Sequence, residues 1–355
     1  MTRDDQFDLA DLRLVDWAPR SQLRARVTDV SRPAVPVVDV HNHLGRWQSG
    51  GVWMVDDVRA LVASMDDCGV ETIVNLDGRW GDEVTANVER YDRAHPDRFV
   101  TFCHVDWSRL AEPGGVAQLT ASLDDSVARG ARGVKVWKDL GLWVRDADGR
   151  TILPDDPRVI EVLAHAGSLG LPVLIHTADP IAFFEPLDRH NERLDELAGM
   201  PDWWFGDRDR YPSFDRLLDA HAALVLACPD TRFIGAHAGC AAEDLDRVER
   251  LLTAAPNYTI DTAGRMAELG RQPRRFARLV DAHPERVLFG TDCYPPTTEQ
   301  YRLHYRFFET DDEGFAYDPD DEIPGQGRWD VSALALDPKL LEAVYRGNAR
   351  RVLGL

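Results

Sequence analysis

The amino-acid sequence predicts a single (β/α)8 barrel, and three observations lead to that fold. The chain has 355 residues, a length that suits one barrel with insertions. Eight short apolar runs alternate with amphipathic stretches of helical length, as expected of parallel βα units. None of these runs is followed by a GxGxxG turn, so an open, doubly wound sheet is the weaker alternative.

The expected strands are the runs richest in β-branched and apolar residues: 37–41, 72–76, 99–105, 133–137, 172–176, 232–237, 258–261 and 286–291. Helical periodicity predicts helices between them over 55–68, 84–94, 116–129, 156–169, 214–227, 242–254 and 273–282. A last helix is expected over 338–353, which completes the alternation.

The barrel is expected to span residues 36–355, with an extension at 1–35 that packs across its outside or bottom. The stretch 177–213 follows the fifth strand and is rich in aromatic residues, which predicts a lid-like insertion over the active-site face. The stretch 293–329 follows the eighth strand, and its acidic run from Asp311 to Glu322 is expected to be solvated.

The amino-acid composition argues against several classes of partner and cellular location. The formal net charge is −20, which argues against nucleic acid or an anionic membrane as the main partner. The five cysteines are widely spaced and include no CxxC pair, as in reduced intracellular proteins. The N-terminus has no apolar signal-like run, and no apolar stretch is long enough to span a membrane. We therefore expect a cytoplasmic protein that acts on a small molecule.

The first strand ends in the sequence Asp39-Val40-His41-Asn42-His43. Side chains alternate along a strand, so His41 and His43 should project to the same side. Two imidazoles a few ångström apart suit one divalent cation. Taken alone, the pair could equally be two ordinary polar residues of a loop.

Other strands end in residues of the same chemical type. His176 ends the fifth strand, His237 the sixth and Asp292 the eighth. The carboxyl ends of all barrel strands meet at one mouth, whereas chance would scatter such residues between the two ends. The sequence therefore predicts a metal site at the mouth.

At these residues the sequence resembles the amidohydrolase superfamily, and most of all the branch that contains aminocarboxymuconate semialdehyde decarboxylase and related hydrolases. The matching motifs are VVDVHNHL, LPVLIHTADP, FIGAHAG, LFGTDCYP and VYRGNARRVLGL. The resemblance runs from about residue 36 to the C-terminus. It implies the superfamily but neither a substrate nor a reaction type, and it makes a homodimer a natural expectation.

The resemblance also implies a role for each motif residue. His41, His43, His176 and Asp292 match the ligands of one divalent metal, usually zinc. His237 matches a histidine that polarises the substrate or shuttles a proton, although it could be a hydrogen-bonded pocket residue without a catalytic role. Asp292 also matches the proton acceptor for metal-activated water, whose pKa a bound cation lowers to ~7.

Lys135 on the fourth strand leaves the number of metals open. In binuclear relatives a lysine of this strand is carboxylated and bridges two metals, and His176 and His237 would then serve the second one. A buried ammonium group is costly without a partner, so Lys135 could instead bind a substrate carboxylate or pair with Asp77 or Asp106.

Other residues are weaker candidates. Arg46 and Trp47 follow the histidine pair and are predicted substrate-pocket residues, with a surface-loop arginine as the alternative. Lys138 lies on the opposite face of its strand from Lys135, and we expect it to pair with Asp139 or a helix carboxylate. The remaining helix and loop histidines are expected at the surface: His165, His190, His221, His283 and His304.

The leading prediction is a metal-dependent hydrolase. Metal-activated water would attack an amide, lactone or ester of a small molecule and break a C–N or C–O bond. A nonoxidative metal-dependent decarboxylase of a small carboxylic acid is the first alternative. A non-catalytic binding protein on a barrel scaffold is the second.

Overall fold

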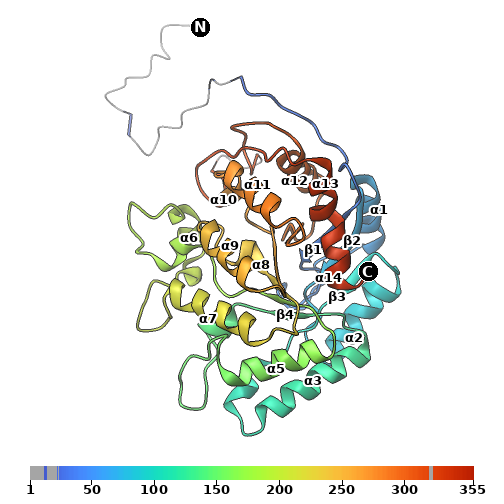
Figure 1. Cartoon of the computed structure of the whole chain (residues 1–355), viewed down its shortest axis with the longest axis vertical. Helices are drawn as coiled ribbons and strands as arrows, with labels where there is room; N and C mark the ends of the chain where they lie inside the picture. The colour runs from blue at the N-terminus through green and yellow to red at the C-terminus, as the bar shows by residue number, and fades with distance from the viewer. Residues whose placement is uncertain (1–11, 14–21, 23, 320–322) are drawn as a thin grey trace.

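The computed structural model describes residues 12–13, 22, 24–319 and 323–355. Its eight parallel strands are β1 (Val37–Asn42), β2 (Val70–Asn75), β3 (Phe99–Thr101), β4 (Val134–Val136), β5 (Val173–Ile175), β6 (Phe233–Gly235), β7 (Tyr258–Asp261) and β8 (Val287–Leu288). They pair in chain order and lie at the centre of the molecule, with the helices outside them (Figure 1). The predicted (β/α)8 barrel is confirmed.

The regular ladders form two sheets, β1 to β3 and β4 to β8, and main-chain hydrogen bonds link them at both seams. At the first seam the Cys103 amide donates to Gly133 O at 2.9 Å, and the Lys135 amide donates to Cys103 O at 2.7 Å. At the second the Asp292 amide donates to His41 O at 2.9 Å. Three predicted site residues therefore lie at the seams between the two sheets: His41, Lys135 and Asp292.

Helices follow the strands at nearly the predicted positions. The α-helices are α1 (Val58–Cys68), α2 (Asp82–Val88), α3 (Gly115–Arg129), α4 (Asp139–Leu142), α5 (Pro157–Ser168), α6 (Leu194–Gly199), α7 (Phe214–Ala227), α8 (Ala236–Gly239), α9 (Leu245–Ala254), α10 (Met266–Leu269), α11 (Pro273–Ala282), α12 (Thr298–Glu309), α13 (Pro338–Glu342) and α14 (Asn348–Leu353). Short 3-10 or π segments are η4 (Glu89–Arg93), η5 (Trp107–Ala111), η6 (Ile181–Phe184), η7 (Pro201–Trp203) and η8 (Ala343–Gly347). No helix within the described ranges is long and apolar enough to cross a membrane.

Helix starts are fixed by side chains that accept hydrogen bonds from the first-turn amides. These N-cap residues are Asp57, Asp156, Ser213, Asp244, Thr297 and Asp337. At the start of α12, Thr297 and Gln300 form a reciprocal capping box.

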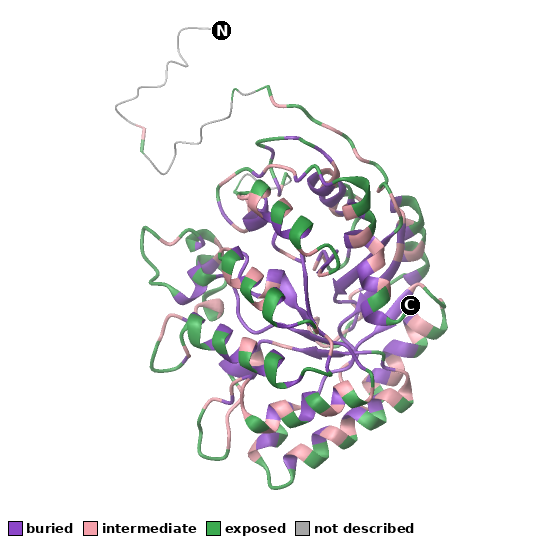
Figure 2. Cartoon of the chain, viewed as in Figure 1, coloured by how far each residue is buried: buried purple, intermediate pink, exposed green. Residues whose placement is uncertain are grey.

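One end of the barrel is closed by apolar packing. The interior cluster of strand residues continues into Ala349, Val352 and Leu353 of α14. Arg132, which precedes β4, donates to Gly354 O at 3.2 Å, so α14 covers the amino ends of the strands. The strands and the inner helix faces are buried while the outer helix faces are exposed (Figure 2). The carboxyl ends of the strands are left for the site.

One residue of the acidic run differs from expectation, and it contacts the N-terminal extension. Asp312 is buried and not solvated, because its carboxylate accepts bonds from the Thr28 amide at 2.7 Å, the Thr28 hydroxyl at 2.8 Å and Arg306 Nε at 2.8 Å. Residues 1–11, 14–21, 23 and 320–322 lie outside the described residues.

Two of the histidines expected at the surface are buried, because each lies on the inward face of its helix. His221 on α7 contacts the Thr177 hydroxyl through Nδ1 at 2.8 Å and the Tyr258 hydroxyl through Nε2 at 3.0 Å. His304 on α12 contacts Gln300 O through Nδ1 at 2.7 Å.

Candidate metal centre and substrate cavity

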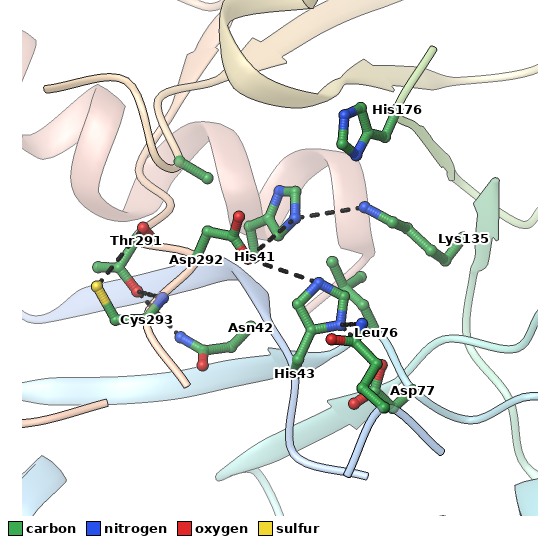
Figure 3. A network of polar contacts seen from close by, with 12 residues as sticks. His41, Asn42, His43, Leu76, Asp77, Lys135, His176, Thr291, Asp292 and Cys293 are labelled. Atoms are coloured by element: carbon green, nitrogen blue, oxygen red, sulfur yellow. Dashed lines mark hydrogen bonds and ion pairs between the residues drawn. The ribbon is translucent and has the colours of Figure 1, made fainter. Parts of the chain in front are cut away.

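His41 and His43 converge on Asp292 at the carboxyl end of β1 (Figure 3). His41 Nε2 lies 3.7 Å from Asp292 Oδ1, and His43 Nε2 lies 3.5 Å from the same oxygen. Both imidazoles are buried. The alternation of side chains along the strand therefore brings the two rings to one point, as the spacing predicts.

The opposite nitrogen of each ring is held by a carboxylate at the carboxyl end of another strand, Asp261 on β7 or Asp77 just after β2. His41 Nδ1 donates to Asp261 Oδ2 at 2.8 Å, and His43 Nδ1 donates to Asp77 Oδ1 at 2.7 Å. Such bonds fix the ring orientation and turn the Nε2 lone pair toward the centre, as in metal sites whose ligands are held by outer carboxylates. Burial opposes ionisation of Asp77, but the contacts with His43 and Trp47 and the nearby His104 together outweigh it and lower the pKa of Asp77.

His237 and Asp292 reach the centre from strained backbone. Both have left-handed φ angles of 58°, which are costly for residues other than glycine. The His237 amide donates to Asp261 Oδ1 at 2.8 Å, and its Nδ1 donates to Ala263 O at 2.8 Å. One ligand atom each from His41, His237 and Asp292 lie within 4.8 Å of one another.

The turn that carries His237 is backed by Tyr258. Residues from His237 to Cys240 all have positive φ angles. A Cβ atom on Gly235 would lie 1.9 Å from the Tyr258 hydroxyl, and one on Gly239 would lie 2.7 Å from it. Only glycine fits at these two positions while Tyr258 stays in place.

His176 lies beside this group but is held in a different way. Its ring centroid lies 4.4 Å from that of His237, and its Nε2 contacts Asp179 Oδ1 at 3.2 Å. Asp179 also binds Lys138 Nζ at 2.6 Å. The sequence prediction that Lys138 pairs with Asp139 or a helix carboxylate is wrong, because β4 ends at Val136 and strand alternation no longer orients Lys138.

The donors that remain fit a divalent cation. Asp292 Oδ1 and His176 Nδ1 are buried and, among the described residues, have no hydrogen-bond partner. Native proteins rarely leave such atoms unsatisfied. Burial lowers the pKa of His41 and of His237 well below the usual value and lowers that of His176 to about 3. These three imidazoles are therefore neutral at physiological pH, as metal ligation requires.

Lys135 points at the same centre. The side chain is buried, and its Nζ lies 3.3 Å from His41 Nε2 (Figure 3). Burial lowers the pKa of Lys135 to about 8. It forms no ion pair with Asp77 or Asp106, the two acids expected from the sequence. Its carboxylation and a second metal stay predictions.

Arg46 and Trp47 lie in the first loop after the histidine pair. Arg46 makes a two-point bond to Glu83, with Nε at 2.9 Å and Nη2 at 2.8 Å from its carboxylate oxygens, and it does not line the central cavity. Trp47 Nε1 donates to Asp77 Oδ1 at 2.8 Å. Their roles as substrate-pocket residues stay predictions.

A cavity of about 380 Å³ opens above the centre. His41, His43, His176, His237 and Asp292 all line it. Its walls are aromatic, from Trp137, Trp143, Phe183, Trp203 and Tyr294. Phe183 and Trp203 belong to the stretch 177–213, whose assignment as a lid stays a prediction.

Sequence reasoning missed Arg265 and Asp261. Arg265 lines the cavity, is buried and donates to Gly264 O at 2.7 Å, but it forms no ion pair with a described carboxylate. Arg193 in the same wall is instead paired with Glu196 and Glu268. Asp261 ends β7 and could have been found by the strand-end rule, whereas Arg265 lies in an irregular loop that carries no such signal.

A family model described as amidohydrolase matches residues 38–355, which is nearly the whole barrel. No curated protein matches the chain in sequence.

Solved structures share the fold at low sequence identity, which supports the architecture alone. A 2,6-dihydroxybenzoate decarboxylase from Rhizobium is 15% identical with a TM-score of 0.56, covering 90% of this chain and 99% of that one. A dihydroxybenzoic acid decarboxylase from Polaromonas, with manganese and 2-nitroresorcinol bound, is 12% identical with a TM-score of 0.55, covering 90% and 97%. An amidohydrolase from Burkholderia multivorans with bound zinc is 15% identical with a TM-score of 0.55, covering 90% and 100%.

Proposed function

This chain belongs to the amidohydrolase family, and on that premise we propose that it is a metal-dependent decarboxylase of small carboxylic acids. The observation that carries the proposal is the buried guanidinium of Arg265, in the same cavity wall as His237 and Asp292, which forms no direct ion pair with a described carboxylate. Glu196, Glu243 and Asp292 attract it only through space, and a substrate carboxylate would supply the direct partner that a buried cation favours. Dihydroxybenzoate decarboxylases share the fold, so the barrel accommodates this chemistry.

The proposed centre holds one divalent metal, with zinc favoured by three or four imidazoles and one carboxylate. His41, His43, His176 and Asp292 would bind it, and Lys135 stays unmodified. A cation at this centre would supply Lewis-acid polarisation of substrate oxygen atoms.

The chain's own side chains complete the reaction. Arg265 orients the substrate by its carboxylate, and the aromatic walls exclude water from the cavity. The bond between the substrate carbon and its carboxyl group breaks, and the electron pair stays on the carbon. Carbon dioxide leaves, and Asp292, which takes up a proton from solvent water before the step, delivers that proton to the carbon. His237, fixed through Nδ1 by Ala263 O, keeps its Nε2 facing the reacting end of the substrate.

The test uses zinc-loaded and manganese-loaded protein with a panel of aromatic and aliphatic carboxylic acids. We expect carbon dioxide release and, in deuterated water, one deuterium on the carbon that lost the carboxyl group. Arg265→Gln should lower kcat/KM by about 30-fold or more, because it removes one partner of a buried charge pair. Decarboxylation that survives Arg265→Gln unchanged would contradict the role of Arg265.

Hydrolysis is the second candidate, and the position of Asp292 favours it. Its two oxygens lie 3.5 Å from His43 Nε2 and 4.0 Å from His237 Nε2, so it could accept a proton from water as readily as it delivers one to carbon. Turnover of esters, lactones or amides, with no release of carbon dioxide from any acid, would make this the better assignment.

A further inference from the structure

A second cavity, of about 270 Å³, lies next to the first over the ends of β2, β3 and β4. Trp137 lines both cavities and so forms a wall between them. The second cavity is lined by Trp47, Trp80 and Trp107 together with the polar groups of Arg79, His104 and Lys135. None of these polar groups is used by the mechanism proposed above.

Arg79 is the unexplained group in this cavity. Its guanidinium carbon lies 4.7 Å from the centre of the Trp47 ring and 4.1 Å from that of the Trp80 ring, so two cation–π contacts hold it. Within the described part of the chain its side chain forms no hydrogen bond and no ion pair. Its backbone is also left-handed, with a φ of 54°. The fold thus fixes a half-buried guanidinium in the lining of the cavity, without a direct hydrogen-bond partner among the described residues.

Arg46 offers a comparison in the same region, because its guanidinium has a direct carboxylate partner. It also lies over a tryptophan, 4.9 Å from the Trp53 ring, but its donors bind both oxygens of Glu83. It lines neither of the two cavities. Arg79, like Arg46, packs over tryptophan rings, but no described carboxylate binds its guanidinium directly.

The two acids in the cavity do not fill that role. Asp106 accepts bonds from the Ser108 hydroxyl at 2.6 Å and lies 3.3 Å from Arg109 Nε. Asp139 accepts from the Leu140 amide at 2.9 Å. Both acids attract Arg79 through space, but neither forms a direct ion pair with it, so an incoming anion would be its direct partner.

Lys135 connects the second cavity to the metal centre. It lines the second cavity, and its Nζ lies 3.3 Å from His41 Nε2. A ligand that passes the edge of Trp137 could therefore reach both Arg79 and the metal donors. On this geometry we infer that the second cavity serves as an extension of the active site, reached past Trp137.

We propose that Arg79 binds a second carboxylate of the substrate, so that the enzyme acts on dicarboxylic acids. This inference rests on the proposed function, because it takes the first carboxylate to be the one held by Arg265. The reacting carboxylate lies in the first cavity, and the retained one lies in the second.

The experiment measures binding without turnover, by calorimetric titration of zinc-loaded protein with benzoate and with the three benzenedicarboxylates. At least one diacid should bind about tenfold or more tightly than benzoate, since hydrogen bonds between charged groups are stronger than those between neutral groups. Arg79→Gln should remove that advantage and leave benzoate affinity within about twofold. Arg79→Lys should restore part of it.

Arg46→Gln serves as the matched control and should leave the preference for diacids intact. The proposal fails if no diacid binds more tightly than benzoate, or if Arg79→Gln weakens monoacid and diacid equally. Failure of the decarboxylase assignment would show separately, as tight diacid binding without release of carbon dioxide.

Discussion

His41 and His43 are fixed by carboxylates at the ends of two other strands, Asp261 on β7 and Asp77 just beyond β2, whereas His176 is fixed by Asp179, three residues further along its own loop. The first arrangement ties the ligands to other strand ends of the barrel. The second ties a ligand to the Lys138–Asp179 pair at the base of the aromatic stretch. One side of the centre is therefore preorganised by the fold, and the other side depends on a loop.

The largest effect is expected at Asp292, where the two sides meet. Asp292→Asn keeps a neutral oxygen that can still bind a metal, but it cannot carry a proton at neutral pH. Turnover should fall by about 10²–10⁴-fold while part of the metal is kept. Metal content and rate must be measured on the same sample. A fully metallated variant with near-normal turnover would assign proton transfer to His237.

The next effect concerns the strand-fixed side. In Asp261→Asn the amide group cannot accept both the His41 Nδ1 hydrogen and the His237 amide hydrogen. Metal affinity should fall toward the upper end of the ~10–100-fold range known for outer carboxylates of metal sites. Competition with a chromophoric chelator measures it.

The loop-fixed side should respond less. Asp179→Asn can still accept a hydrogen bond from Lys138 or from His176, and His41 and His43 keep their own carboxylates. We expect metal affinity to fall by only about tenfold. Equal losses of metal affinity for Asp179→Asn and Asp261→Asn in the same chelator assay would contradict this comparison. The two ways of fixing the ligands would then contribute equally to metal binding.

The smallest effect distinguishes two neighbouring tryptophans in the stretch 177–213. Trp203 lines the cavity, whereas Trp204 donates to Glu185 O at 2.8 Å and does not line it. Trp203→Leu should raise KM about three- to tenfold, as expected for the loss of one aromatic contact. Trp204→Leu should lower the melting temperature with little change in KM. The reverse result would place the wrong tryptophan over the substrate.

The sequence predicts the strand-borne part of this site better than the rest, for a physical reason. The spacing of His41 and His43 follows from the two-residue period of a strand, and their convergence needs only the barrel rule. Lys138 lies just beyond a strand end, where that period no longer holds. Arg79 and Arg265 lie in loops, where local sequence does not determine the direction of a side chain.

The close approach of Tyr258 to two glycines also limits the order in which amino-acid substitutions can accumulate at these three positions. An alanine at Gly235 or Gly239 would collide with the Tyr258 hydroxyl, at 1.9 Å and 2.7 Å respectively. A smaller side chain at Tyr258 must therefore come first, and that substitution removes the partner of His221 Nε2. Each step alone is unfavourable, so the three positions should be inherited as a unit among descendants that keep the turn carrying His237.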